Sequence, residues 1–169
     1  MPSVWAEADL SGILVENRSQ TPDRFELRVL CSNRPSAVRK TLASVMAALS
    51  DMGLSEDERG NVELVLAEVL NNVAEHAYEE DIEGLIELTA RREDDHLRFT
   101  VTDEGRPMPG GCMPATPAPN PDPLDCDLPE GGFGWFLIRT LARNLSYERR
   151  GDSNLLRFEI RFDRPLRGS

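Results

Sequence analysis

The sequence predicts an α/β (α+β) two-layer sandwich, in which a mixed, mostly antiparallel sheet carries helices on one face. Three observations lead to this fold class. Segments with alternating apolar residues occur in neighbouring pairs, as in hairpins. Longer segments with helical periodicity lie between these pairs. Strands and helices do not alternate one by one, as a parallel sheet would require.

The chain of 169 residues is long enough for one domain with a single core, which we assign to residues 23–163. Residues 1–22 are polar and mixed, and we expect an N-terminal tail or an extra strand there. Residues 164–169 are expected to form a C-terminal tail. The first strand of the domain is predicted at residues 25–29, where apolar and charged residues alternate.

Two helices are predicted after this strand. The first runs from Pro35 through about Met52, and Gly53 ends it. The second begins at the capping box Ser55-Glu-Asp-Glu58, in which the serine and the last glutamate each bond the other's backbone N–H. It runs to about Tyr78.

A hairpin is predicted next, from strands at residues 85–92 and 97–101. Residues 106–131 then follow, rich in proline and glycine and without an apolar period. A loop of this length inside a domain is commonly functional, and a mobile lid is the usual case.

The third helix is predicted to begin at Gly132-Phe-Gly134 and to keep its apolar side through Leu145. A last hairpin then joins strands at residues 146–150 and 155–162 through a turn at residues 151–154. No Walker-type phosphate-binding loop occurs anywhere in the chain.

The formal net charge of −11 argues against nucleic acid or an anionic membrane as a partner. Cys31, Cys112 and Cys126 are too widely spaced for a zinc-binding pair or a disulfide framework, as in a reduced cytosolic protein. The N-terminus lacks the basic and apolar regions of a signal peptide, and no stretch is apolar for long enough to span a membrane. We therefore expect a cytoplasmic location.

The second helix carries Glu68, Asn72 and His76 at intervals of four residues, which places them on one face. A carboxylate and an oxygen ligand for a hard metal ion are what phosphoryl transfer requires. Alone, this pattern is more typical of a solvated helix face, and His76 of a structural histidine.

Two further motifs follow. Asp103 and Gly105 come directly after a predicted strand, where an aspartate can accept a hydrogen bond from a base and a glycine lets the backbone pass close to it. Gly132 and Gly134 open a helix, where backbone N–H groups and the helix dipole favour phosphate. Each motif alone also fits an ordinary turn.

In this order, the motifs resemble the N, G1 and G2 boxes of the GHKL (histidine kinase-like) ATPase superfamily, and most closely the anti-sigma factor serine/threonine kinases. The matching stretches are ELVLAEVLNNVAEHAYEE, LRFTVTDEGRPM and GGFGWFLIRTLARNLSYERRGDSNLLRFEI, within residues 25–162. The resemblance implies a Bergerat-type ATP-binding fold, in which residues 106–131 are the ATP lid.

The resemblance also implies roles for single residues. Glu68 falls on the catalytic carboxylate, and Asn72 on the ligand that holds Mg²⁺ and ATP. Asp103 falls on the adenine-reading aspartate. The remaining ATP-binding positions are matched by His76, Gly105, Gly132 and Gly134.

The function implied is that of an ATP-dependent serine/threonine protein kinase acting as an anti-sigma regulatory factor. Such a protein phosphorylates a STAS-type antagonist, binds a sigma factor and commonly forms a homodimer. Two alternatives remain open at this point. One is a non-catalytic ATP-binding switch that binds protein partners, and the other is a simple ATPase or an interaction module without a nucleotide.

Overall fold

A computed structural model describes residues 13–21, 24–115 and 132–162 of the chain. Residues 1–12 of the segment 1–22, which was predicted as a tail or an extra strand, and the predicted C-terminal tail at residues 164–169 lie outside the described residues. So do residues 116–131, which hold most of the predicted lid and Cys126.

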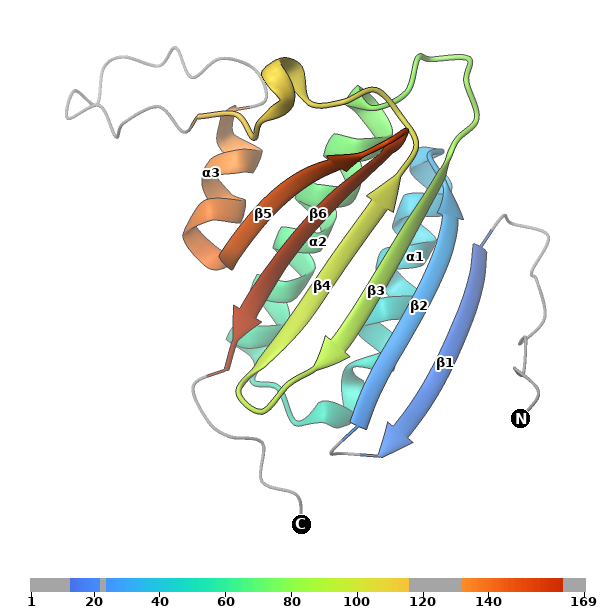
Figure 1. The fold of residues 1–169 in the computed structure, drawn as a ribbon. Coiled ribbons are helices and arrows are strands. Elements are labelled where there is room, and N and C mark those ends of the chain that lie inside the picture. Colours follow the sequence, from blue (N-terminus) through green and yellow to red (C-terminus); the bar gives the residue numbers. More distant parts are fainter. Residues whose placement is uncertain (1–12, 22–23, 116–131, 163–169) are drawn as a thin grey trace.

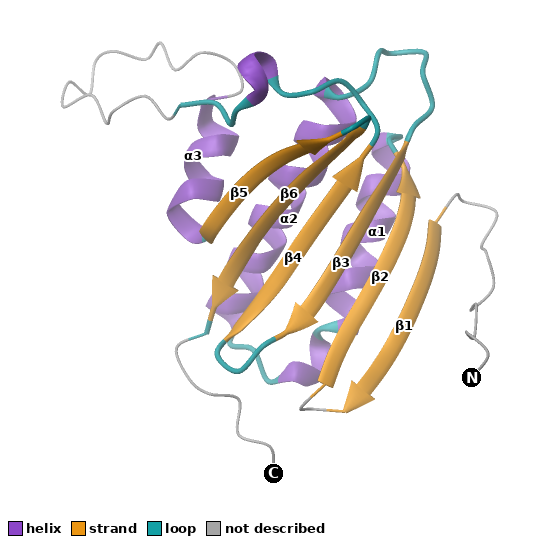
Figure 2. Ribbon diagram, in the orientation of Figure 1, coloured by secondary structure: helices purple, strands orange, loops and turns teal. Residues whose placement is uncertain are grey.

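In the described part of the chain, six strands form one sheet, and three helices cover one of its faces (Figures 1 and 2). The strand order is β1-β2-β3-β4-β6-β5, and every two neighbours run antiparallel. The two-layer sandwich predicted from the sequence is therefore confirmed, with antiparallel pairing throughout the described sheet. The strands are β1 (Ile13–Thr21), β2 (Arg24–Ser32), β3 (Leu85–Arg92), β4 (His96–Asp103), β5 (Arg143–Arg150) and β6 (Ser153–Arg161). The helices are α1 (Pro35–Ala48), α2 (Glu56–His76) and α3 (Gly132–Leu141), with the short 3-10 turns η1 (Ser50–Met52) and η2 (Pro109–Gly111).

The start of α2 is the predicted capping box. The Ser55 hydroxyl accepts from the Glu58 N–H at 3.2 Å, and the Glu58 carboxylate accepts from the Ser55 N–H at 2.7 Å. The helix ends at His76 rather than at Tyr78, because Tyr78 turns toward the sheet. Its ring packs against Gly84, and its hydroxyl donates to the Leu85 carbonyl at 3.0 Å.

The ends of the two other helices also differ from the prediction. Helix α1 ends at Ala48, and the segment up to Met52 is the separate turn η1, closed by Gly53 at φ 69°. Helix α3 ends at Leu141, so Leu145 lies in β5 and the prediction of a helix through Leu145 was wrong. The reason is the pairing of β5 with β6, which already begins at Arg143. Asn144, whose backbone has φ 50°, lies at an irregularity in that pairing.

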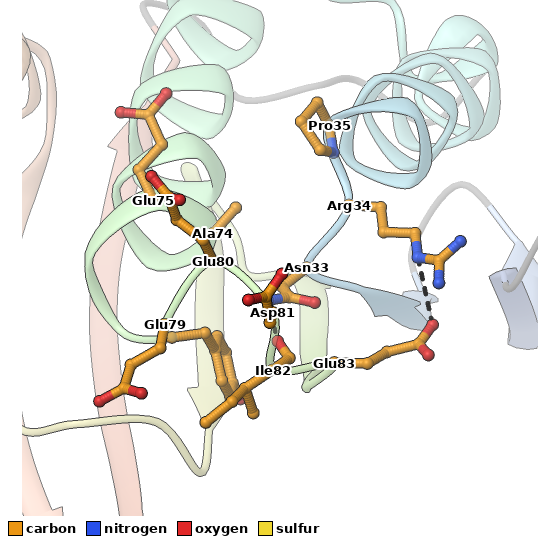
Figure 3. Close-up of a pocket in the computed structure, with 11 residues that line it drawn as sticks. Asn33, Arg34, Pro35, Ala74, Glu75, Glu79, Glu80, Asp81, Ile82 and Glu83 are labelled. Carbon is orange, nitrogen blue, oxygen red and sulfur yellow. Dashed lines mark hydrogen bonds and ion pairs between the residues drawn. The ribbon is translucent and has the colours of Figure 1, made fainter.

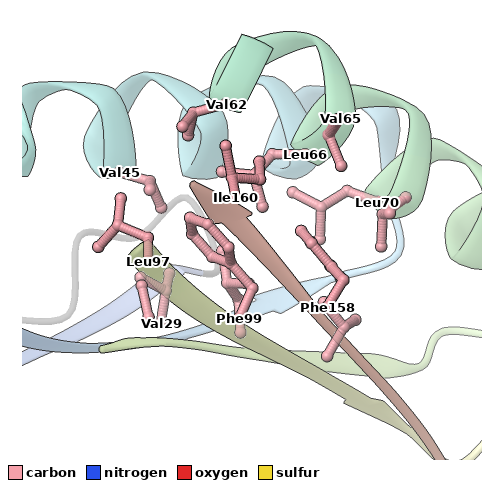
Figure 4. Packing of buried hydrophobic residues seen from close by; sticks show 14 of the residues in the cluster. Val29, Val45, Val62, Val65, Leu66, Leu70, Leu97, Phe99, Phe158 and Ile160 are labelled. Carbon is pink, nitrogen blue, oxygen red and sulfur yellow. The ribbon is translucent and has the colours of Figure 1, made fainter. Parts of the chain in front are cut away.

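The core lies between the sheet and the helices (Figure 4). Phe99 of β4 and Phe158 of β6 are fully buried and stack with their ring centroids 5.2 Å apart. Alternate residues of both strands are buried on the same face of the sheet as these rings, as the period of two in a strand requires. The helices add an apolar layer against them, which includes Val45, Val62, Val65, Leu66 and Leu70.

The opposite face of the sheet carries cross-strand ion pairs instead of helices. Arg28 bonds Glu87 at 2.7 Å, and Arg91 bonds Glu26 at 2.8 Å. Within the described residues, no helix is long and apolar enough to cross a membrane.

Candidate functional site

Helix α2 presents its polar side chains beside the core stripe. Glu68 and Asn72 are half-buried, whereas His76 is exposed. The Asn72 amide nitrogen is buried and has no hydrogen-bond partner among the described residues. A buried donor without a partner is costly, so this amide is available to a ligand.

The beginning of α3 lies against these two side chains. Gly132 is the first residue of the helix, and Gly134 follows within its first turn. A Cβ atom added at Gly134 would lie under 3.0 Å from Glu68 Oε2, 3.4 Å from Glu68 Cδ and 3.9 Å from the Asn72 amide nitrogen. Only a glycine therefore lets α3 come this close to the Glu68 carboxylate.

Asp103 ends β4 and is buried, with 5% of its surface exposed. Burial raises the pKa of its carboxyl group, because a negative charge is poorly solvated there. Hydrogen bonds from Asn154 and from the Gly105 N–H oppose this rise in pKa, as does the positive charge of Arg149. Those bonds measure 2.7 Å and 2.9 Å, respectively. Only glycine fits at position 105, because a Cβ atom there would lie 2.5 Å from the Ala77 carbonyl oxygen.

Asn154 lies at the candidate site, although the sequence did not indicate it. Asn154 was predicted in a turn, but it lies in β6, is buried, and pairs across the strands with Asp103. Its amide oxygen accepts from the Tyr147 hydroxyl at 2.7 Å and from Arg149 Nη1 at 2.8 Å. The strand register opposite Asp103 would have identified Asn154, but register requires knowing which strands are neighbours.

A cavity of about 620 Å³ brings several of these groups together. It lies between the end of α2, the end of β4, the start of β6 and the first residues of the predicted lid. Glu68 and Gly134 lie next to it, beside Asn72, and are not part of its lining. The predicted site residues in the lining are Asn72, His76 and Asp103, joined by Val69, Val73, Ala77, Arg106, Pro107, Met108, Pro109, Pro114, Ala115, Trp135, Tyr147, Asn154 and Leu156.

A second cavity, of about 660 Å³, lies between the end of α2, the start of α1 and the loop before β3 (Figure 3). Its lining is strongly acidic, and its one arginine, Arg34, pairs with Glu83 at 3.4 Å. It contains none of the predicted site residues. Since these carboxylates would repel a phosphate chain, the first cavity is the better candidate for a nucleotide. The acidic residues are Glu75, Glu79, Glu80, Asp81 and Glu83.

The described residues contain no group of three or more His, Cys, Asp or Glu side chains that could hold a metal ion alone. The predicted metal ligand is therefore a single group, the amide oxygen of Asn72, rather than a cluster of such side chains. A small hard cation with one protein ligand takes its other ligands from phosphate oxygens and water, as Mg²⁺ does.

Comparison with known proteins identifies a family and several similar proteins. The family profile of the histidine kinase-like ATPase domain matches residues 31–160. Serine-protein kinase RsbW of Staphylococcus epidermidis is 32% identical over 124 residues, which cover 72% of this chain and 76% of that protein. The protein of the same name from Halalkalibacterium halodurans is 29% identical over 142 residues, which cover 82% and 83%. The solved histidine kinase domain of the Erythrobacter litoralis EL346 blue-light activated histidine kinase aligns with a TM-score of 0.44 and 24% identity, over 76% of this chain and 61% of that one.

Proposed function

Because this chain belongs to the histidine kinase-like ATPase family, we propose that it is an ATP-dependent serine/threonine protein kinase acting as an anti-sigma regulatory factor. It phosphorylates a small antagonist protein of the STAS fold and binds a sigma factor while that antagonist is phosphorylated. The relatives named serine-protein kinase support the kinase activity. The order and content of the three sequence motifs support the anti-sigma role.

The contact of Gly134 with Glu68 carries this proposal. It brings the N-terminus of α3, where backbone N–H groups favour phosphate, beside a carboxylate that can act on a hydroxyl. An inert nucleotide-binding protein would not need a carboxylate at this point, because its negative charge opposes phosphate binding.

Asp103 is proposed to read the base. Both of its hydrogen bonds from described residues end on Oδ1. Its Oδ2 is therefore the oxygen left to accept a hydrogen bond from the exocyclic amine of adenine in the cavity. Apolar side chains of the lining, such as Val73 and Met108, offer surface to the flat ring.

Asn72, Gly132 and Gly134 are proposed to hold the phosphates. The buried Asn72 amide nitrogen, which has no partner among the described residues, can donate to a phosphate oxygen and leaves the amide oxygen for a metal ion. Asn72 would hold Mg²⁺, whose charge offsets that of the phosphate oxygens. The first-turn glycines let the N–H groups of α3 reach the phosphate chain without side chains in the way.

Glu68 is proposed as the base. It orients the partner's serine or threonine hydroxyl and takes its proton as the hydroxyl oxygen bonds to the γ-phosphorus. The bond from phosphorus to the bridging oxygen breaks, and ADP leaves with that electron pair. His76 lines the same cavity from one turn further along α2 and would contact the bound nucleotide.

Acting on a sigma factor places the protein in the cytoplasm. We propose a homodimer as well, from the family resemblance, and light scattering of the purified chain would show its mass.

The proposal is tested by incubating the purified chain with Mg²⁺, γ-labelled ATP and a purified STAS-type antagonist. The wild-type chain should label the antagonist on serine or threonine. Glu68→Gln should bind ATP at least as tightly as the wild type, because it removes a negative charge, and should transfer no label. A complex that forms with the antagonist without any transfer by the wild type would instead favour the non-catalytic switch.

ATP binding itself has a separate test in thermal unfolding. ATP at 100 times its Kd should raise the free energy of unfolding by about 2.7 kcal/mol. An unchanged melting temperature at millimolar Mg-ATP would count against every nucleotide-dependent function.

A further inference from the structure

Asn154 has its amide orientation fixed by its neighbours. Arg149 can only donate hydrogen bonds, so the atom that faces it at 2.8 Å must be the Asn154 amide oxygen. The Tyr147 hydroxyl accepts from the Met108 N–H at 3.0 Å and so donates its own proton to that same oxygen at 2.7 Å. The Asn154 NH₂ group must then face Asp103.

This orientation imposes a hydrogen-bonding state on Asp103. An NH₂ group 2.7 Å from Oδ1 offers a proton, as does the Gly105 N–H on the same oxygen. Asp103 therefore meets two donors from the protein and no acceptor among its bonded neighbours. These two donors favour a carboxylate that only accepts, against the rise in pKa that burial causes, so its free Oδ2 also presents an acceptor to the cavity.

The same group of residues holds the backbone that follows Asp103. Asn154 Nδ2 also contacts the carbonyl oxygen of Arg106 at 3.0 Å and that of Gly105 at 3.3 Å. Arg149 Nη1 donates to the Gly105 carbonyl at 2.7 Å. The Arg106 N–H in turn donates to the Ala77 carbonyl at the end of α2, also at 2.7 Å.

From these contacts we propose that Asn154 is a positioning residue for base selection. Held by Tyr147 and Arg149, it keeps Asp103 as an acceptor, so that the cavity binds a base with an amine at position 6 and disfavours one with a carbonyl there. It also ties this selection to the position of residues 105–108, the first residues of the predicted lid. The inference rests on the proposed function, because it takes Asp103 as the base-reading group.

The test measures the affinities of the full chain for ADP and for inosine diphosphate, which differ at position 6, by calorimetry. Asn154→Asp replaces the NH₂ with an oxygen, and two facing carboxyl groups then retain a proton between them. Asp103 can now donate, so the preference for ADP should fall roughly tenfold or more. A merely structural role would weaken both nucleotides together and leave the ratio unchanged.

Asn144→Asp is the matched control. Asn144 also donates its amide to a carboxylate, that of Glu159, but it is exposed and does not line the cavity. This variant should keep the wild-type preference. If Asn154→Asp does not fold, Tyr147→Phe, which removes one of the two groups that orient the amide, should lower the preference by a smaller factor.

The outcomes separate the two proposals. A wild-type chain that binds neither nucleotide would overturn the proposed function and this inference with it. A wild type that prefers ADP, with the preference unchanged in Asn154→Asp and in Tyr147→Phe, would overturn the inference about Asn154 alone. Equal affinity of the wild type for both nucleotides would also overturn it.

Discussion

Replacing Gly134 by alanine tests how the beginning of α3 positions the Glu68 carboxylate. The new methyl group would lie under 3.0 Å from Glu68 Oε2, and this oxygen must retreat by about 1 Å to reach ordinary contact. Since Oε2 is the end of a flexible side chain, the fold can adapt. The reacting geometry cannot, and a displacement of about 1 Å can lower a rate by roughly 100-fold. Stability should stay the same or rise by up to ~1 kcal/mol, because alanine favours a helix over glycine.

The assay combines single-turnover transfer from γ-labelled ATP to the STAS-type antagonist with urea denaturation of each variant. Gly60→Ala is the matched control, because a Cβ at this exposed position of α2 meets nothing within 4 Å. It should gain similar stability and transfer phosphate at the wild-type rate. If Gly134→Ala also transferred phosphate at that rate, either Glu68 would not be the base or Gly134 would not position it.

Three other changes have distinct expected outcomes. Folding raises the pKa of Asp103 above its ordinary value of 3.8, so the folded state holds this proton more tightly and the stability contributed by Asp103 is lost as pH rises through that raised value. Asp103→Asn should therefore be at least as stable as wild type at pH 7 in urea denaturation, yet bind ADP more weakly. If the free energy of unfolding of the variant, minus that of wild type, were lower at pH 7 than at pH 4, this reasoning would be contradicted. Asn72→Leu should make ATP affinity insensitive to EDTA, whereas EDTA should weaken ATP binding to the wild type in calorimetry. Ser55→Ala should cost about 1 kcal/mol in urea denaturation through loss of the α2 cap, with no change in ATP affinity.

Features that depend on neighbouring residues in the chain were predictable from sequence. The capping box at Ser55 needs only the four residues of its own turn, and it was found as predicted. The family expected from the order of the motifs is likewise confirmed by the match to residues 31–160. The alternation that buries Phe99 and Phe158 follows from the period of a strand.

Features that depend on distant residues were not predictable. Tyr78 looked helical, but its ring is drawn to Gly84, and this tertiary contact ended α2 earlier than its periodicity indicates. Leu145 has the helical spacing of α3, but the pairing of β5 with β6 begins at Arg143 and places Leu145 in a strand. Asn154 looked like a turn residue, and only the pairing of β4 with β6 places it opposite Asp103.

For the same reason, the sequence showed which site residues share an element but not which of them are in contact. Glu68 and Asn72 share a helix, so their spacing alone put them on one face. Their contact with Gly134 involves two helices that are far apart in sequence. Sequence reasoning could set these groups in order along the chain, but it could not show which of them touch.

The position of Trp135 in the cavity lining has a practical consequence. The chain has two tryptophans, and the other, Trp5, lies outside the described residues. With Trp5 replaced by phenylalanine, all indole emission would come from a side chain in the wall of the cavity, 8% exposed. The protein thus contains its own optical probe, and stopped-flow recordings could follow ligand entry without a dye or a labelled nucleotide.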